Sequence, residues 1–277
     1  MARVIAIANQ KGGVGKTTTA VNLAASLAVA ERRTLLIDGD PQGNATSGTG
    51  IESGSFERTT YDVLIRAADI RSSRIRGVQF QHLDVVPATP DLAGAEVELV
   101  DTDDRELRMR QAVQLVRDEY EFILIDCPPS LGLITLNMLA AADALLIPLQ
   151  CEYYALEGLS QLLNTVHLIQ HSVNPSLAIS GVLLTMFDAR LNLSRQVATD
   201  AREYFGSQVF DTVVPRNVRL AEAPSFGKPI VLYDVQSIGA QAYIAVAHEL
   251  IARETATAKA THHHLAAIDA HTHEASA

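Results

Sequence analysis

Several residue types are rare or missing in this sequence, and each shortage excludes a class of protein. Among 277 residues there is no tryptophan, and only Cys127 and Cys151 are cysteines. Two cysteines in apolar segments exclude a disulfide-stabilised scaffold and a cysteine-ligated cluster, and they favour a reducing cytoplasm. No apolar run reaches the roughly 18 residues of a membrane-spanning helix, and an apolar segment begins directly after Arg3. We therefore expect neither a membrane span nor a signal peptide.

Positive charge is also in short supply. The chain has 22 lysines and arginines against 32 acidic residues, a net charge of −10. This balance argues against a general affinity for nucleic acids. The stretch 190–228 differs, because it carries six basic against four acidic residues. An acidic protein can therefore still present one basic face.

Apolar segments alternate with segments of helical period along most of the chain. The strand-like segments are residues 4–8, 34–37, 83–86, 122–125, 144–147, 179–184 and 208–210. The helical patterns cover residues 18–30, 105–119, 156–170, 194–204 and 241–253. The strand-like segments are apolar at nearly every position, as in parallel strands buried on both faces. We therefore predict an α/β fold in which helices flank a doubly wound, mostly parallel central sheet.

The helical period stops near Arg253. Residues 254–277 are rich in alanine, threonine and histidine, so we expect a disordered tail there. This tail has no basic amphipathic face that would bind a membrane. Without a repeat or a linker to divide them, residues 1–253 are predicted to form one domain.

A glycine-rich turn follows the first predicted strand, where residues 10–18 have the sequence Gln-Lys-Gly-Gly-Val-Gly-Lys-Thr-Thr. Backbone N–H groups of such a turn surround phosphate oxygens, and the following helix adds its partial positive charge. Lys16 is placed to reach the β- and γ-phosphates, Thr17 to ligate Mg²⁺ and Thr18 to bind the α-phosphate. The residues predicted to bind ATP here are Lys11, Gly12, Gly13, Val14, Gly15, Lys16, Thr17 and Thr18.

This loop departs from the strict P-loop pattern at its start. Gln10 stands where that pattern has glycine, and Lys11 adds a second lysine ahead of the glycines.

Acidic residues follow two other predicted strands. Asp38 and Asp40 come after the strand at 34–37, and Asp126 after the strand at 122–125. Beside a P-loop, such carboxylates hold Mg²⁺ or orient the attacking water. We assign Asp126, Asp40 and Thr17 to the metal, and we favour Asp40 over Asp38 as the catalytic group that positions water.

At these residues the chain resembles the ParA/Soj branch of the deviant Walker A ATPases, P-loop proteins whose superfamily includes MinD. The matching segments are residues 11–18, 38–44, 86–96, 126–130, 148–159 and 215–229. They extend over residues 3–252, so the resemblance covers the whole predicted domain.

The resemblance implies a homodimer in the ATP state. Two subunits enclose two ATP molecules, and Lys11 of each reaches the partner's phosphates as a catalytic cation alongside Lys16. Gly12 lies at a close contact between subunits. Pro215 and Asn217 flank the adenine, and Glu152 approaches the partner's ribose.

The resemblance also implies non-specific binding of double-stranded DNA and stimulation by a ParB-type centromere-binding protein. The candidate phosphate contacts are Arg190, Arg195, Arg219 and Lys228, with Arg202 as a further candidate. A second arginine group at positions 66, 71, 74 and 76 is a weaker candidate. These properties imply a cytoplasmic, nucleoid-associated protein without stable membrane association.

Two other interpretations of the sequence stay open. A MinD-like ATPase would act at a membrane, but residues 241–253 have a core-type apolar stripe where a membrane-binding amphipathic helix is needed. A nucleotide-binding scaffold with negligible turnover would share the same loop. Because the first predicted strand begins within the first few residues, we expect no N-terminal helix-turn-helix extension, which favours the small chromosomal form of the family.

Overall fold

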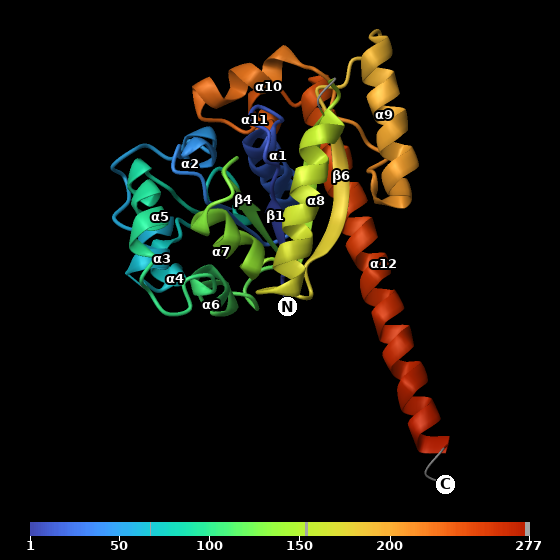
Figure 1. Ribbon diagram of the computed structural model, residues 1–277. Helices are drawn as coiled ribbons and strands as arrows, with labels where there is room; N and C mark the ends of the chain where they lie inside the picture. The colour runs from blue at the N-terminus through green and yellow to red at the C-terminus, as the bar shows by residue number, and fades with distance from the viewer. Residues whose placement is uncertain (67, 153–154, 275–277) are drawn as a thin grey trace.

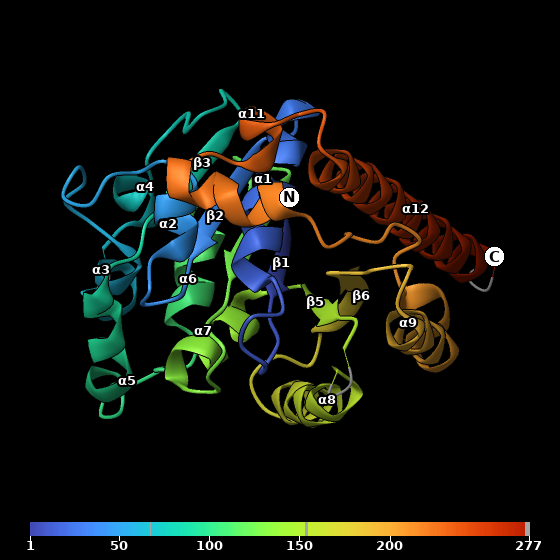
Figure 2. The same ribbon diagram turned by 90° about the horizontal axis from the view of Figure 1, so that it is seen from above.

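The computed structural model describes residues 1–66, 68–152 and 155–274, without the side chains of 155–161 and 257–274. Within these residues, six strands form one sheet in the order β3-β2-β4-β1-β5-β6 (Figures 1 and 2). Every neighbouring pair is parallel. The strands are β1 (Arg3–Ile7), β2 (Thr34–Asp38), β3 (Leu83–Val86), β4 (Phe122–Asp126), β5 (Ala144–Gln150) and β6 (Ala178–Thr185).

The sheet separates two apolar cores, one on each face. Alternate residues of β1 divide between them, so that Val4 joins one core and Ile5 the other. Because both faces are buried, the strands contain few polar positions, and this confirms the interpretation of the continuous apolar runs. The seventh predicted strand, 208–210, is wrong. Only Val209 forms a bridge, to Val182, because a 3₁₀ turn precedes it and the ladder ends there.

Helices cover both faces of the sheet, as Figures 1 and 2 show. One core packs under α1 (Lys16–Val29) and α12 (Ile238–Glu274), and the other packs under α6 (Arg108–Gln114), α7 (Leu133–Ala141), α8 (Ala155–His171) and α9 (Asn192–Phe205). The shorter helices are α2 (Asn44–Gly48), α3 (Thr60–Ile65), α4 (Ile70–Ser73), η1 (Pro90–Gly94), α5 (Ala95–Glu98), η2 (Gly206–Gln208), α10 (Val218–Glu222), η3 (Ala223–Phe226) and α11 (Ile230–Tyr233). The predicted doubly wound α/β fold is confirmed.

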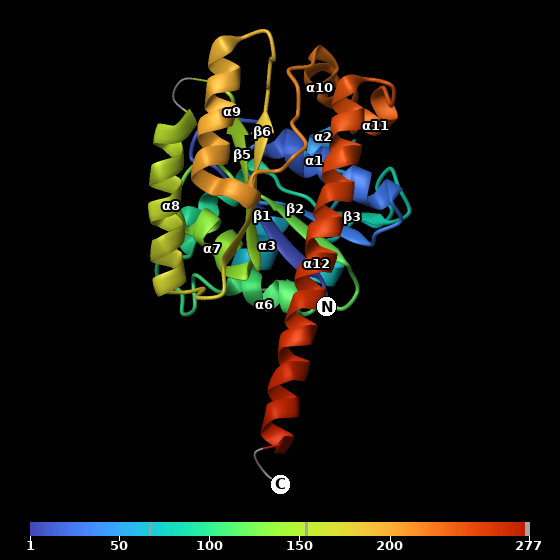
Figure 3. The same ribbon diagram turned by 90° about the vertical axis from the view of Figure 1, so that its right-hand side faces the viewer.

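The last helix runs further than the sequence predicts. Glu254 pairs with Arg3 at 3.0 Å, and α12 continues to Glu274 and projects beyond the sheet in Figure 3. Residues 254–277 are rich in alanine, which has the highest helix propensity, and the expected disorder of this tail stays a prediction. The domain boundary after residue 253 stays a prediction. Among the described residues, no helix combines the length and hydropathy that a bilayer-spanning segment needs.

Candidate nucleotide-binding site

The loop between β1 and α1 is anchored to the ends of neighbouring strands. The side chain of Asn9 donates to the carbonyl of Pro148 in β5 at 2.8 Å and accepts from the backbone N–H of Lys11 at 3.1 Å. Further along, the hydroxyl of Thr185 at the end of β6 donates to the carbonyl of Val14 at 2.9 Å. These bonds fix the loop at the carboxyl edge of the parallel sheet, where doubly wound folds bind ligands.

The glycines of this loop permit an unusual backbone conformation and leave space beside the backbone. Gly13 and Gly15 have positive φ angles of 74° and 89°, which side chains with a Cβ rarely adopt. A Cβ added at Gly12 or Gly13 would meet no heavy atom within 4 Å, so the backbone of both residues faces open space. Gly15 precedes α1 and makes no side-chain cap, so the first N–H groups of this 14-residue helix are available to an anion.

The two lysines of the loop have different surroundings. Lys16 is only 7% exposed, and its ammonium donates to the backbone carbonyl of Lys11 at 3.1 Å. Burial lowers the pKa of Lys16, while the nearby Asp126, Cys127 and Asp40 act in the opposite direction. The Lys11 side chain makes no hydrogen bond or ion pair within the described part of the chain. Lys16 therefore belongs to its own loop, whereas the Lys11 ammonium is free to meet a charge from outside.

Asp126, the last residue of β4, is completely buried, and no hydrogen bond of ordinary geometry reaches either of its oxygens within the described residues. Burial raises the pKa of this carboxyl well above its usual range. Asp38, its register partner on β2, raises it further, and Thr17 and Lys16 oppose the shift. An unpartnered buried carboxylate beside a threonine hydroxyl is a set of hard oxygen donors, which Mg²⁺ prefers. These residues therefore fit the metal that the sequence predicts.

Asp38 and Asp40 are distinguished by their hydrogen bonds. Asp38 accepts from the N–H of Asp40 at 3.1 Å and from the N–H and hydroxyl of Thr46 at 2.8 and 2.7 Å. Burial raises the pKa of Asp38 to about 6, despite these bonds from Thr46 and Asp40. Asp40 uses one oxygen to cap the N–H of Gln42 at 2.9 Å and has no bond to the other in the described chain. Asp38 thus holds the backbone, and Asp40 keeps an oxygen for a ligand or water.

The two predicted adenine contacts, Pro215 and Asn217, lie beyond β5 and β6 together with Glu152, which is predicted to approach the partner's ribose. Pro215 bridges to Phe187, and Glu152 pairs with Arg216 at 2.9 Å. The side-chain oxygen of Asn217 is buried without a hydrogen-bond partner among the described residues, and Asn217 precedes α10 without capping it. An amide oxygen in this state suits the exocyclic amine of a base.

Sequence reasoning gave no role to Glu96, although it ends a segment that supports the family resemblance. Its carboxylate accepts from the N–H of Leu133 at 2.7 Å and from that of Ile134 at 3.3 Å. Glu96 in α5 thus caps the start of α7 from outside the helix. Helix α7 was itself not predicted, so its cap could not be sought in the sequence.

We expect Glu96→Ala to lower the free energy of unfolding by about 1–2 kcal/mol, because two N–H groups at the start of α7 lose their acceptor. The measurement is urea unfolding followed by circular dichroism. Glu98→Ala is the matched control, since Glu98 lies in the same helix and accepts only from the exposed hydroxyl of Tyr61 among the described residues. Its loss should stay below about 1 kcal/mol. Equal losses would contradict a special role for Glu96.

The five candidate DNA contacts of the stretch 190–228 are exposed. Arg190 forms a two-point pair with Asp188, and Arg219 pairs with Glu222 at 2.9 Å. Arg195 donates to the carbonyl of Ala189 and to the side chain of Asn192. Lys228 and Arg202 make no side-chain hydrogen bond or ion pair within the described residues. Arg195 and Arg202 lie on α9 and Arg219 lies on α10, and Figures 1 and 3 show these two helices toward the same end of the molecule.

Comparison with known proteins agrees with this geometry. A family model described as an AAA domain matches residues 2–179. The chain is 60% identical over 253 residues to chromosome partitioning protein ParA of Myxococcus xanthus, covering 91% of this chain and 89% of that protein. It is 58% identical over 252 residues to sporulation initiation inhibitor protein Soj of Bacillus subtilis, covering 91% and 99%.

A similar solved structure comes from Mycobacterium smegmatis, where a protein named cobyrinic acid a,c-diamide synthase was crystallised with ADP and magnesium. It is 36% identical with a TM-score of 0.79, and the match covers 91% of this chain and 94% of that chain. The same protein was also crystallised with an ATP analog and magnesium. The sequence motifs, the P-loop geometry and these relatives lead to one conclusion: the chain belongs to the ParA/Soj family of partitioning ATPases.

Proposed function

We propose that this protein is an ATP-dependent DNA-partitioning switch. ATP binding joins two copies into a dimer that binds double-stranded DNA without sequence preference, and slow hydrolysis, stimulated by a ParB-type partner, releases it. The observation that carries this proposal is the difference between the two lysines of the loop. Lys16 is bound within its own chain, whereas the Lys11 ammonium has no partner among the described residues.

ATP binding and hydrolysis would depend on five residues of the site. Thr17 and Asp126 would hold Mg²⁺, which neutralises phosphate charge when it is bound. Lys16 and the N–H groups of the loop would bind the phosphates, and the free oxygen of Asp40 would orient the attacking water. Lys11 would complete the charge balance from the second subunit, so the dimer would depend on the γ-phosphate.

DNA binding would follow from dimerisation. The chain carries a net charge of −10, so one modest basic face would bind phosphates weakly. Two copies side by side would double that face, and the contacts would be Arg190, Arg195, Arg219 and Lys228. The affinity for DNA would therefore depend on the bound nucleotide, and the ATP-bound dimer would associate with the nucleoid.

The test is electrophoretic retardation of a random-sequence duplex with ATP, with ADP and without nucleotide. We expect retardation only with ATP, and weaker retardation as salt rises. Binding that is equal in all three states would overturn the switch. Sedimentation with anionic lipid vesicles in the same three states is run in parallel. ATP-dependent vesicle binding without DNA binding would favour the MinD-like alternative instead.

Single substitutions refine the same assay. Lys228 has no acidic partner within the described chain, whereas Arg219 pairs with both Glu222 and Asp234. Lys228→Ala and Arg219→Ala should each weaken retardation of the duplex. Arg32→Ala, which removes an arginine that pairs with Glu121 and is no candidate for DNA contact, serves as the charge-matched control and should leave the retardation unchanged.

A further inference from the structure

A cavity of about 420 Å³ lies at the amino ends of β2, β3 and β4. Arg33 and His82 directly precede β2 and β3, and Tyr120 lies shortly before β4. The register pairs Thr34 with both Leu83 and Phe122, so the starts of these three strands lie side by side. This is the edge of the sheet opposite the nucleotide loop, and the switch proposed above makes no use of it.

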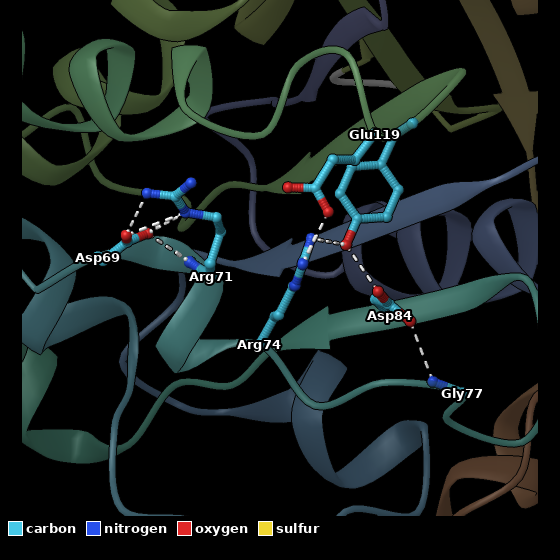
Figure 4. A network of polar contacts seen from close by, with 7 residues as sticks. Asp69, Arg71, Arg74, Gly77, Asp84 and Glu119 are labelled. Carbon is cyan, nitrogen blue, oxygen red and sulfur yellow. Dashed lines mark hydrogen bonds and ion pairs between the residues drawn. The ribbon is translucent and has the colours of Figure 1, made fainter.

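The floor of the cavity is a closed network of polar contacts, shown in Figure 4. The Arg74 side chain is 2% exposed, donates to the hydroxyl of Tyr120 at 2.7 Å and pairs with Glu119 at 2.7 Å. Tyr120 in turn donates to Asp84 at 2.6 Å, and the other oxygen of Asp84 accepts from the N–H of Gly77 at 3.0 Å. The two carboxylates that line the cavity are therefore engaged. Arg74 still has a buried Nε–H without an acceptor among the described residues.

The rim of the cavity carries two arginines of a different kind. Arg33 and Arg76 are exposed, and within the described chain neither guanidinium has an acceptor. Their neighbours in sequence behave otherwise, because Arg66 pairs with Asp62 and Arg71 forms a two-point pair with Asp69. Figure 4 shows that last pair apart from the Arg74 network. The arginine group that the sequence offered as a weak DNA contact thus divides into paired, buried and free members.

The charges of the lining leave an excess of positive sign. Three guanidinium groups, of Arg33, Arg74 and Arg76, stand against the two carboxylates of Asp84 and Glu119, and His82 adds a further nitrogen donor or acceptor. This excess occurs on a chain whose net charge is −10. The volume lies in the range of small-molecule sites, and a guanidinium matches the two-oxygen geometry of phosphate and carboxylate groups.

We propose that this cavity binds a small anion with two or more phosphate or carboxylate groups, which Arg33 and Arg76 hold above the fixed floor of Arg74 and Tyr120. It is a second ligand site, independent of the nucleotide loop. The rigid floor sets the depth of the site, and the two free guanidinium groups supply the charge.

Isothermal titration calorimetry with pyrophosphate and, separately, with citrate tests this site. The titrations use the full chain carrying Lys16→Ala, in EDTA, so that the nucleotide loop contributes little phosphate binding. We expect at least one probe to bind, and Arg33→Ala combined with Arg76→Ala to weaken it roughly 100-fold, about tenfold for each charge-assisted contact. The preferred probe distinguishes a phosphate ligand from a carboxylate ligand.

The matched control is Arg58→Ala combined with Arg71→Ala, which removes two exposed arginines of the same region that do not line the cavity. This control should leave the affinity unchanged, and thermal unfolding should show that both double variants remain folded. The proposal is overturned if neither probe binds, or if the control loses as much affinity as the cavity variant. It is also overturned if the cavity variant retards duplex DNA less than wild type, which would assign this face to DNA. Because the titration uses Lys16→Ala, failure of the ATP switch leaves this result unaffected.

Discussion

Lys11→Ala should bind ATP with little loss of affinity and yet remain a monomer, whereas wild type should dimerise with ATP. Lys16 is held in its own loop and is the cation proposed to bind the phosphates within one chain. ATP binding by a single chain should therefore need no Lys11 ammonium. Dimerisation brings two triphosphates together at an interface, and there each missing Lys11 ammonium leaves buried negative charge without compensation. Truncating one member of a buried charge pair lowers the binding free energy of a complex by about 2–5 kcal/mol, and the symmetric dimer would lose two such pairs.

Sedimentation velocity with ATP, ADP and no nucleotide measures this effect. Asp40→Ala is the control, because Asp40 is proposed to orient the attacking water, so this variant should still dimerise with ATP and accumulate as a DNA-bound dimer. Titration with ATP should give similar affinities for wild type and Lys11→Ala. A Lys11→Ala protein that dimerises as wild type does would remove the lysine from the partner's site.

Gly12 gives an independent test of the same interface. A Cβ at this position meets nothing within 4 Å in its own chain, so Gly12→Val should fold and leave the loop of the monomer intact. If the variant loses ATP-dependent dimerisation, the obstruction must come from a second copy of the chain. Dimerisation equal to that of wild type would place Gly12 away from the interface.

The sheet could be predicted because its strands are buried on both faces, which leaves a continuous apolar signal in the sequence. The loop between β1 and α1 stands out in the sequence because Gly12, Gly13, Gly15 and Lys16 lie close together along the chain. Helix α7 escaped prediction, since it is apolar almost all round and shows no helical period. Its cap, Glu96, lies 37 positions before Leu133, and local pattern does not report a contact over that separation.

The arginines at positions 66, 71, 74 and 76 likewise differ in ways that the local sequence does not indicate. In sequence, Arg74 is one of several basic residues and resembles its exposed neighbours. Its burial depends on Tyr120, 46 positions away, and on Glu119 beside it. Similarly, the sequence separates Asp38 and Asp40 only weakly, whereas their hydrogen bonds distinguish them, above all those that Asp38 accepts from Thr46. Patterns along the chain predict whether a segment is a strand, a helix or a loop. The burial and hydrogen bonding of each charged side chain depend instead on residues that are distant in the sequence.

Asp126→Asn should abolish ATP hydrolysis and, without magnesium and nucleotide, make the protein more stable than wild type. The wild-type carboxyl is completely buried, neither oxygen has a hydrogen bond of ordinary geometry in the described chain, and Asp38 lies beside it in the register. Burial and this neighbour raise the pKa of Asp126 well above its usual range. A carboxyl whose pKa is raised on folding favours the folded state when protonated, and that contribution is lost as pH rises through the folded pKa.

The neutral amide avoids that cost, so we expect a gain of about 1–2 kcal/mol in the free energy of unfolding, larger at pH 8 than at pH 5. Urea unfolding in EDTA measures the gain, and phosphate release with ATP and Mg²⁺ measures the loss of activity. Asp38→Asn is the control, because Asp38 accepts three hydrogen bonds and its replacement should destabilise the chain. A lower urea midpoint for Asp126→Asn would show that this carboxylate supports the fold. A higher midpoint with lost hydrolysis would mean that the chain keeps a costly buried charge for the cation it binds.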